Sequence, residues 1–165
     1  MKRFRLPLVA IAVLLMCRAC MADAFLERLS GQWSGGGWAR QTPEAPREAV
    51  RCRLSFIPKG SSGSLEVTGK CAGAGSQSQV SARLTPLGNG LYRATWSAAG
   101  WRLDHMSGRR SGDRLLFRWS SQEGNATEVV TGEFGLALFG SALSLKTRQT
   151  TPKPAEIGEL ELRRR

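Results

Sequence analysis

The stretch VRCRLSFIPKGSSGSLEVTGKC, residues 50–71, contains two alternating apolar and polar segments on either side of a glycine- and serine-rich turn. Successive side chains of a β-strand point to opposite faces, so this alternation predicts two strands, each with one buried face. The turn favours a tight reversal. Pairing the strands across it sets Phe56 opposite Val67 and Cys52 opposite Cys71. The hydrophobic register and the cysteine register therefore agree on one antiparallel hairpin.

The first 24 residues have the pattern of a cleaved secretory signal peptide. Basic residues precede an apolar run over 6–16, and small residues follow at Ala22 and Ala24. The run is too short for a helix that spans a bilayer, which takes about 20 apolar residues. The sequence therefore predicts cleavage after Ala24, a single domain over 25–165, no transmembrane segment, and a periplasmic or secreted location.

Removal of the leader also removes Cys17 and Cys20, so Cys52 and Cys71 are the cysteines that remain. Two cysteines in an exported domain most simply form one disulfide, which should stabilise the fold by roughly 3 kcal/mol. The alternative is a metal or redox pair, but neither a CxxC spacing nor further ligands accompany these cysteines. We therefore expect a disulfide, no metal site and no cofactor.

Nearly every later segment alternates with period two and ends at glycine, proline, asparagine or serine, which is typical of an all-β domain. Strands with one apolar face need a closed barrel or a sandwich, and we expect a small antiparallel up-and-down barrel after a short helical turn near 25–29. The segment 134–145 is apolar on both faces and is interpreted as a buried strand rather than a membrane-contacting loop. The predicted strands cover 31–41, 48–58, 64–72, 78–87, 91–98, 101–108, 114–122, 126–133, 141–149 and 156–164.

Four of the five tryptophans lie in two copies of one phrase, WSGGGW at 33–38 and WSAAGW at 96–101. A separation of five residues puts the two tryptophans of an unbroken strand on opposite faces, so one of each pair should lie inside. The glycines of the first copy permit a sharp bend. The second copy favours a tight turn between two strands. We interpret the repetition as structural reuse, with a duplicated binding element as the alternative.

The sequence LSGQW at 29–33 resembles the Gly-x-Trp opening of lipocalins and other calycins. The resemblance implies a calycin-type barrel in which Trp33 packs at the closed end against an arginine of a late strand. Arg164 is the candidate partner, because it shares strand parity with Leu160 and Leu162.

Most of the chain from residue 25 onward also resembles an uncharacterised family of small exported proteins of Gram-negative bacteria. The shared features are WSGGG at 33–37, REAVRCR at 47–53, CA at 71–72, WS at 96–97 and LELRR at 160–164. This resemblance implies one domain with one disulfide. It supplies no catalytic residue.

No group of residues indicates catalysis. His105 is the single histidine and lies on a predicted strand, no triad can be assembled, and the acidic residues are scattered. The glycines at 35–37 lack the Lys-Ser or Lys-Thr of a phosphate loop. We therefore expect a monomeric, non-catalytic binding protein rather than an enzyme.

Aromatic residues on the predicted inner faces suggest a ligand cavity. Tyr92, Trp96, Phe117 and Trp119 are the candidate lining of a site for a small apolar or amphipathic molecule. The alternative is that these aromatics fill the core.

The chain is strongly basic, with a net charge of +11. Arg51, Arg53, Arg93, Arg114 and Arg118 form the candidate anion-binding face, and the alternative is an ordinary solvated surface. Export argues against a nucleic acid as the partner and favours an anionic lipid or polysaccharide of the envelope.

A second functional hypothesis follows from this charge. The protein would be an envelope interaction or inhibitor protein that binds a macromolecular partner through its arginines or its N-terminal segment. Secreted bacterial metalloprotease inhibitors, which are similar in outline, inhibit through their free N-terminal stretch.

Overall fold

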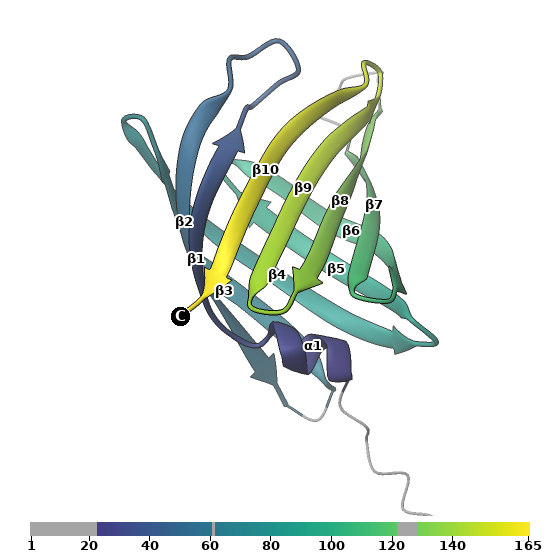
Figure 1. Cartoon of the computed structure of the whole chain (residues 1–165). Helices are drawn as coiled ribbons and strands as arrows, with labels where there is room; N and C mark the ends of the chain where they lie inside the picture. The colour runs from purple at the N-terminus through teal and green to yellow at the C-terminus, as the bar shows by residue number, and fades with distance from the viewer. Residues whose placement is uncertain (1–22, 61, 122–128) are drawn as a thin grey trace, which may run out of the picture.

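The computed structural model describes residues 23–60, 62–121 and 129–165, which form a closed antiparallel barrel (Figure 1). Each strand pairs with the next along the chain, and β10 pairs with β1 to close the barrel. The predicted all-β, up-and-down barrel with a short N-terminal helix is therefore confirmed. The elements are α1 (Ala24–Leu29), β1 (Gly31–Ala39), β2 (Glu48–Lys59), β3 (Ser64–Gly73), β4 (Ser76–Gly88), β5 (Leu91–Ala98), β6 (Trp101–Ser111), β7 (Arg114–Ser121), β8 (Val130–Phe139), β9 (Ala142–Thr151) and β10 (Ala155–Arg164).

The hairpin of β2 and β3 has the predicted register. Phe56 pairs with Val67, and Cys52 pairs with Cys71. The two cysteine sulfurs are bonded to each other, so the predicted disulfide is confirmed and no thiolate pair remains. Because every second residue of β2 is buried from Cys52 to Phe56, this hairpin contributes one continuous apolar stripe to the barrel interior.

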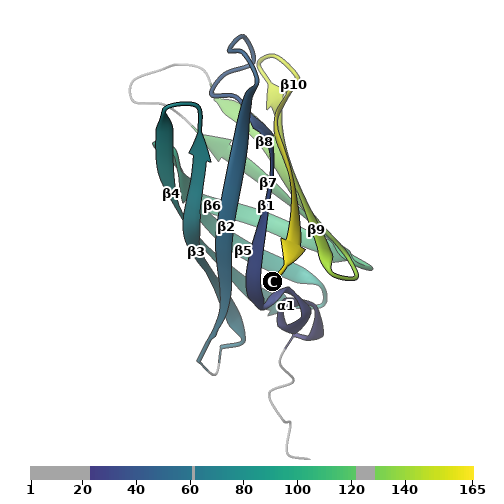
Figure 2. The same cartoon turned by 60° about the vertical axis from the view of Figure 1, so that its left-hand side comes forward.

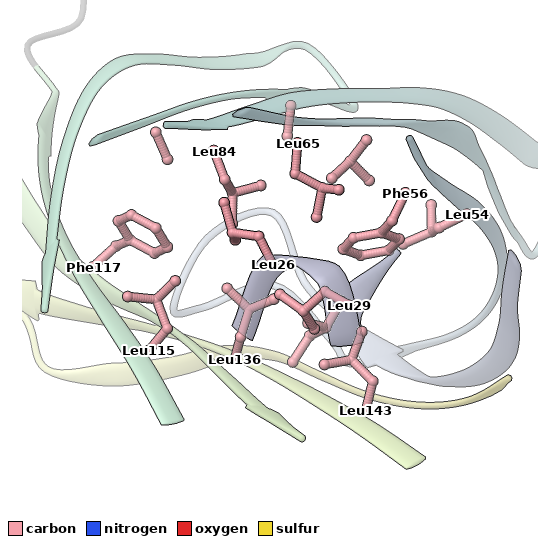
Figure 3. Close-up of a cluster of buried hydrophobic side chains, with 14 of the residues drawn as sticks. Leu26, Leu29, Leu54, Phe56, Leu65, Leu84, Leu115, Phe117, Leu136 and Leu143 are labelled. Carbon is pink, nitrogen blue, oxygen red and sulfur yellow. The ribbon is translucent and has the colours of Figure 1, made fainter. Parts of the chain in front are cut away.

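Helix α1 closes the end of the barrel at which β1 begins (Figures 1 and 2). The carboxylate of Asp23 caps the helix by accepting hydrogen bonds from the backbone N–H groups of Phe25 (3.0 Å) and Leu26 (3.1 Å). Phe25, Leu26 and Leu29 are all buried. Figure 3 shows Leu26 and Leu29 surrounded by leucine and phenylalanine side chains of the strands. This half of the barrel is therefore filled.

The first tryptophan phrase lies on β1 and places its two tryptophans differently. Trp33 is fully buried, whereas Trp38 is half-buried five residues further along the strand. Between them, a Cβ atom on Gly37 would collide with the backbone carbonyl oxygen of Glu159 on β10. Glycine is therefore required here, because β1 and β10 approach each other more closely than side chains allow.

The second phrase spans a turn. β5 ends at Ala98 and β6 begins at Trp101, and the intervening Ala99 and Gly100 have φ angles of 51° and 83°. Two positive φ angles match the twist of a two-residue hairpin. Because Trp96 and Ala98 share a strand face and Ala98 pairs with Trp101, both tryptophans lie on the inner face. The prediction that the two tryptophans of a phrase lie on opposite faces therefore holds for the first copy only.

One predicted strand is placed wrongly. The prediction of 126–133 is replaced by β8, which runs from Val130 to Phe139. The doubly apolar segment 134–145, interpreted as one buried strand, is instead a hairpin that spans the end of β8, a turn at Gly140 and the start of β9. Leu136 and Leu138 are buried in the interior, while Phe139 is 56% exposed, so apolar residues on both faces hide the alternation. The segment 122–128, on which parts of two predicted strands fall, lies outside the described residues, as do residues 1–22 of the predicted leader.

Candidate functional site

A cavity of about 410 Å³ occupies the barrel at the end opposite α1. Its lining comes from the last residues of β1, β3, β5, β7 and β9 and from the first residues of β2, β4, β6 and β10. In an up-and-down barrel these are the strand ends on the side away from the N-terminal helix. The interior is therefore filled at one end and hollow at the other.

The cavity changes from apolar at its floor to polar at its mouth. Leu54, Val80 and Leu145 lie deepest, next to the filled core. Along β9 the inward residues after Leu145 are Thr147 and then Gln149, whose side-chain amide donates to the backbone carbonyl oxygen of Lys153 (3.2 Å). This four-residue step covers roughly 13 Å of strand. The gradient suits a molecule with an apolar body and a polar end.

Aromatic side chains gather around the mouth. Trp96, Trp101 and Trp119 line the cavity from inside the barrel, whereas Trp38 borders its rim at the end of β1, where register places its side chain on the outer face. Trp96 packs against Phe134 with ring centres 5.2 Å apart, and the rings of Trp101 and Trp119 make an edge contact at 6.4 Å. Three of the chain's five tryptophans therefore face this site rather than the filled core.

The indole of Trp119 has an unusual environment. The side chain is 6% exposed, and its Nε1 atom is buried with no hydrogen-bond partner among the residues that the structure describes. A buried donor without a partner costs about 1–3 kcal/mol. The packing of the Trp119 ring against its neighbours has to offset this cost.

The predicted cavity residues divide between the two halves of the barrel. Trp96 and Trp119 line the cavity. Tyr92 lies instead in the filled half, where its ring packs against Phe25 at 6.5 Å and its hydroxyl donates to Asp23 (2.5 Å). Phe117 is also fully buried in that half. The proposal that these two side chains line a ligand site is corrected: they belong to the core.

Burial affects the chemistry of Tyr92. Its pKa is raised above the usual value, mainly because the fold removes the hydroxyl from water, with a further contribution from its hydrogen bond to Asp23. The tyrosine is therefore neutral at physiological pH and serves as a hydrogen-bond donor.

The predicted contact between Trp33 and Arg164 is present at the closed end. The guanidinium carbon of Arg164 lies 4.6 Å from the centre of the Trp33 ring. Its Nη1 donates to the backbone carbonyl oxygen of Ser30 (2.5 Å), and its Nη2 donates to that of Arg28. The Trp33 indole donates to the carbonyl oxygen of Leu29 (2.8 Å). These contacts anchor the last strand to the chain that leaves α1.

The five arginines of the candidate anion face do not share one face. Arg51 and Arg53 are on β2, Arg93 is on β5, and Arg114 and Arg118 are on β7. Intervening strands separate these three strands around the closed barrel. Arg118 also lies 3.6 Å from the carboxylate of Glu133. The predicted single face is therefore corrected to separate sites on the outer wall.

A different group of cations does converge, and we call it the β1 patch. Register places Arg163, Ser34, Arg53 and Lys70 in one row across β10, β1, β2 and β3. Arg165 reaches the same row, because its Nε donates to the Ser34 hydroxyl (2.9 Å). The β1 patch comprises Arg51, Arg53, Lys70, Arg163 and Arg165, all exposed.

The single histidine lies on the outside of the barrel. His105 is exposed on β6, next to an irregularity in the pairing of β5 with β6. Within 23–60, 62–121 and 129–165, no three histidine, cysteine or carboxylate side chains cluster as metal ligands. Over the same residues, no helix has the length and apolar character needed to cross a bilayer.

Sequence reasoning missed Trp101 and the polar residues at the mouth. Because one tryptophan of each phrase was expected inside and Trp96 was named for the cavity, Trp101 was left outside, and Gln149 was not considered. Strand parity indicated that Gln149 faces the barrel interior, since it shares a face of β9 with Leu145. Parity does not predict how deep in the barrel each residue lies, and so does not distinguish the core from the mouth.

The comparisons with known proteins identify the fold. No protein-family model matches the chain, and no curated protein sequence matches it. Among solved structures, the chain is similar to the crystal structure of Rv2717c from M. tuberculosis, with a TM-score of 0.63 and 15% identity over 87% of this chain and 98% of that one. At this identity the similarity supports the barrel fold and nothing finer.

Proposed function

We propose that the protein is an exported, non-catalytic binding protein that holds one small apolar or amphipathic molecule in the cavity opposite α1. The observation that carries this proposal is the cavity itself. Its volume of about 410 Å³ lies in the range of roughly 300–1,000 Å³ typical of small-molecule sites. Its walls are mainly apolar, with polar groups at the mouth.

The export part of this proposal rests on two features of the chain. The leader pattern over 1–24 is that of a secretory signal, and the disulfide between Cys52 and Cys71 suits an oxidising compartment. Both support a periplasmic or secreted location.

A dye-binding experiment with one cavity-filling variant tests the proposal. N-phenyl-1-naphthylamine is uncharged and fluoresces when it enters an apolar site. Ala98 lines the cavity, so Ala98→Phe should weaken dye binding by at least about tenfold by occupying the space. Ser97→Phe adds the same side chain to the exposed face of the same strand and should leave binding unchanged.

The measurement is a fluorescence titration, with circular dichroism to show that each variant keeps its strands. Saturable binding at one site that is lost only in Ala98→Phe supports the proposal. Absence of saturable binding to the wild-type protein, or equal binding by both folded variants, contradicts it. Native mass spectrometry of protein purified from its own host should show an added mass that is lost on denaturation.

A second candidate function rests on the β1 patch. Within the described part of the chain, none of its five cations forms an ion pair, although other basic residues of the barrel do. Its central row crosses three inter-strand spacings, roughly 14 Å. Such a surface would bind an anionic lipid or polysaccharide of the envelope.

Vesicle sedimentation tests this second candidate. Vesicles with anionic headgroups should retain the wild-type protein at low salt, and Arg51→Glu with Arg53→Glu should release it. A control with Arg93→Glu and Arg114→Glu makes the same charge change away from the patch and should remain bound. Equal release of both double variants would show that net charge, not the β1 patch, governs binding.

The N-terminal part of the inhibitor hypothesis is not retained. Phe25 and Leu26 are buried inside the barrel, and Asp23 caps the helix that holds them. This segment is therefore not free to enter the cleft of a partner.

A further inference from the structure

One cation stands at the mouth of the cavity in a fixed position. Arg40 follows the end of β1, is half-buried, and contributes to the cavity lining. Its Nε donates to the backbone carbonyl oxygen of Glu156 (2.6 Å), and its Nη1 donates to that of Pro43 (2.7 Å). These two bonds join the loop after β1 to the start of β10. The guanidinium is therefore held in place by the backbone and not by a carboxylate.

Arg40 retains hydrogen-bonding capacity. A guanidinium has five N–H donors and stays charged at all physiological pH values. Within the described residues, two of these donors have protein partners and no carboxylate oxygen lies within ion-pair distance. A preorganised cation with free donors recognises carboxylate or phosphate groups well, because little side-chain freedom is lost on binding.

The neighbouring charges leave the mouth positive. Glu44 is paired with Lys153 at 3.1 Å, and Glu156 lies 4.0 Å from Arg148. Arg47 stacks on the Trp38 ring, with its guanidinium carbon 3.9 Å from the ring centre. Glu48 also belongs to the lining, and Glu44 interacts electrostatically with Arg40 as well as with Lys153.

The part of the cavity that lies deeper than this rim is lined by uncharged residues. Leu54, Leu145 and Leu160 lie inward of Gln149 and Thr147, so the charged and polar groups are confined to the outer part of the cavity. A ligand that satisfies both parts has an apolar chain directed inward and an anionic group at the rim. The volume of about 410 Å³ is near the lower end of the usual range, which favours one chain over two.

We propose that the cavity binds a single-chain anionic amphiphile, with the chain inside the barrel and the head bound by Arg40 at the mouth. This inference rests on the proposed function of the cavity. It adds the chemical class and the orientation of the ligand, and it assigns to Arg40 a binding role separate from the β1 patch.

A matched series of twelve-carbon probes tests the inference. Dodecanoate, dodecanol and dodecyltrimethylammonium share one chain and differ in the charge of the head. Each is titrated into the purified protein that carries N-phenyl-1-naphthylamine, below its micelle concentration or, for dodecanol, below its solubility limit. Displacement of the dye is followed by fluorescence. Dodecanoate should bind at least about tenfold more tightly than dodecanol, equivalent to about 1.4 kcal/mol, and the ammonium probe should bind most weakly.

Two variants locate the effect. Arg40→Gln should bring dodecanoate to within about threefold of dodecanol without weakening dodecanol. Arg93→Gln removes the same charge from the exposed face of β5 and should keep the wild-type preference. The wild-type series needs no variant, so the head-group preference is tested even if Arg40→Gln does not fold.

The outcomes separate the inference from the function on which it rests. If none of the probes and no dye binds, the proposed function fails. If dodecanol and dodecanoate bind equally, the cavity function stands and the anionic head is refuted. Preference for the ammonium probe would instead indicate that the tryptophans select a cation. A folded Arg40→Gln protein that still prefers dodecanoate would refute the role of Arg40.

Discussion

Replacement of Asp23 by alanine is expected to lower the free energy of unfolding by about 2–4 kcal/mol. One carboxylate oxygen caps α1 through Phe25 and Leu26, and loss of such a cap costs about 1 kcal/mol. The other accepts the hydroxyl of Tyr92, a side chain that is only 1% exposed. A buried hydroxyl left without an acceptor adds about 1–3 kcal/mol. The total is a large part of the roughly 5–15 kcal/mol that stabilises a typical domain.

Urea unfolding of four proteins measures this effect: the wild type, Asp23→Ala, Tyr92→Phe and the double variant. Tyr92→Phe removes the donor and leaves the cap intact, so it should cost about 1 kcal/mol. The double variant should be no less stable than Asp23→Ala, since it contains no orphaned hydroxyl. A loss below about 0.5 kcal/mol in Asp23→Ala, or strictly additive losses in the double variant, would refute the reasoning.

The same contacts bear on where the chain is processed. Cleavage after Ala24, as the sequence analysis predicts, would remove Asp23 and with it both interactions. The folded domain begins two residues earlier than that prediction, so we expect cleavage after Ala22 and a mature chain that starts at Asp23. Mass spectrometry of the N-terminal peptide of the exported protein measures this directly. A peptide that begins at Phe25 would contradict the expectation.

Three further predictions concern single positions of the barrel. Gly37→Ala should destabilise the protein by about 3 kcal/mol in urea unfolding, because its Cβ would meet a backbone carbonyl of β10 that cannot move aside. Ala99→Gly should raise the free energy of unfolding by about 0.5 kcal/mol, because a positive φ is strained for alanine and not for glycine. The raised pKa of Tyr92 implies stability that is complete below about pH 10 and declines as the pH rises further, since the fold disfavours the ionised form. Urea midpoints measured on both sides of about pH 10 should show a smaller decline in Tyr92→Phe than in the wild type.

The β2–β3 hairpin was predictable because several local signals coincide there. Alternation fixes which side chains face inward, and the turn fixes where the chain reverses. Cys52 and Cys71 then test the register independently, since a slip by one residue would place one of them outside. β8 lacks such signals. Phe139 is apolar yet exposed, so the sequence does not show which face of this strand is the outer one.

The arginines show what strand parity leaves undecided. Parity correctly predicts that Arg51, Arg93 and Arg114 are exposed, but the direction in which each one faces depends on its place around the closed barrel. Arg163 and Arg165 join the β1 patch because β10 closes onto β1. That contact joins the first strand to the last, and no local pattern in either segment encodes it.

The hollow half of the barrel also depends on strand register, which decides which residues of neighbouring strands lie at the same level of the barrel. At the closed end, inward positions hold large side chains, and α1 inserts two leucines between them. At the mouth, small residues face inward on adjacent strands: Gly73 pairs with Ser76, Cys71 pairs with Ser78, and Ala98 lies on β5 next to β4. Each small residue alone is unremarkable in the sequence. A cavity results because register brings them to one level of the barrel, where their missing volume adds up beside the tryptophans of β5, β6 and β7.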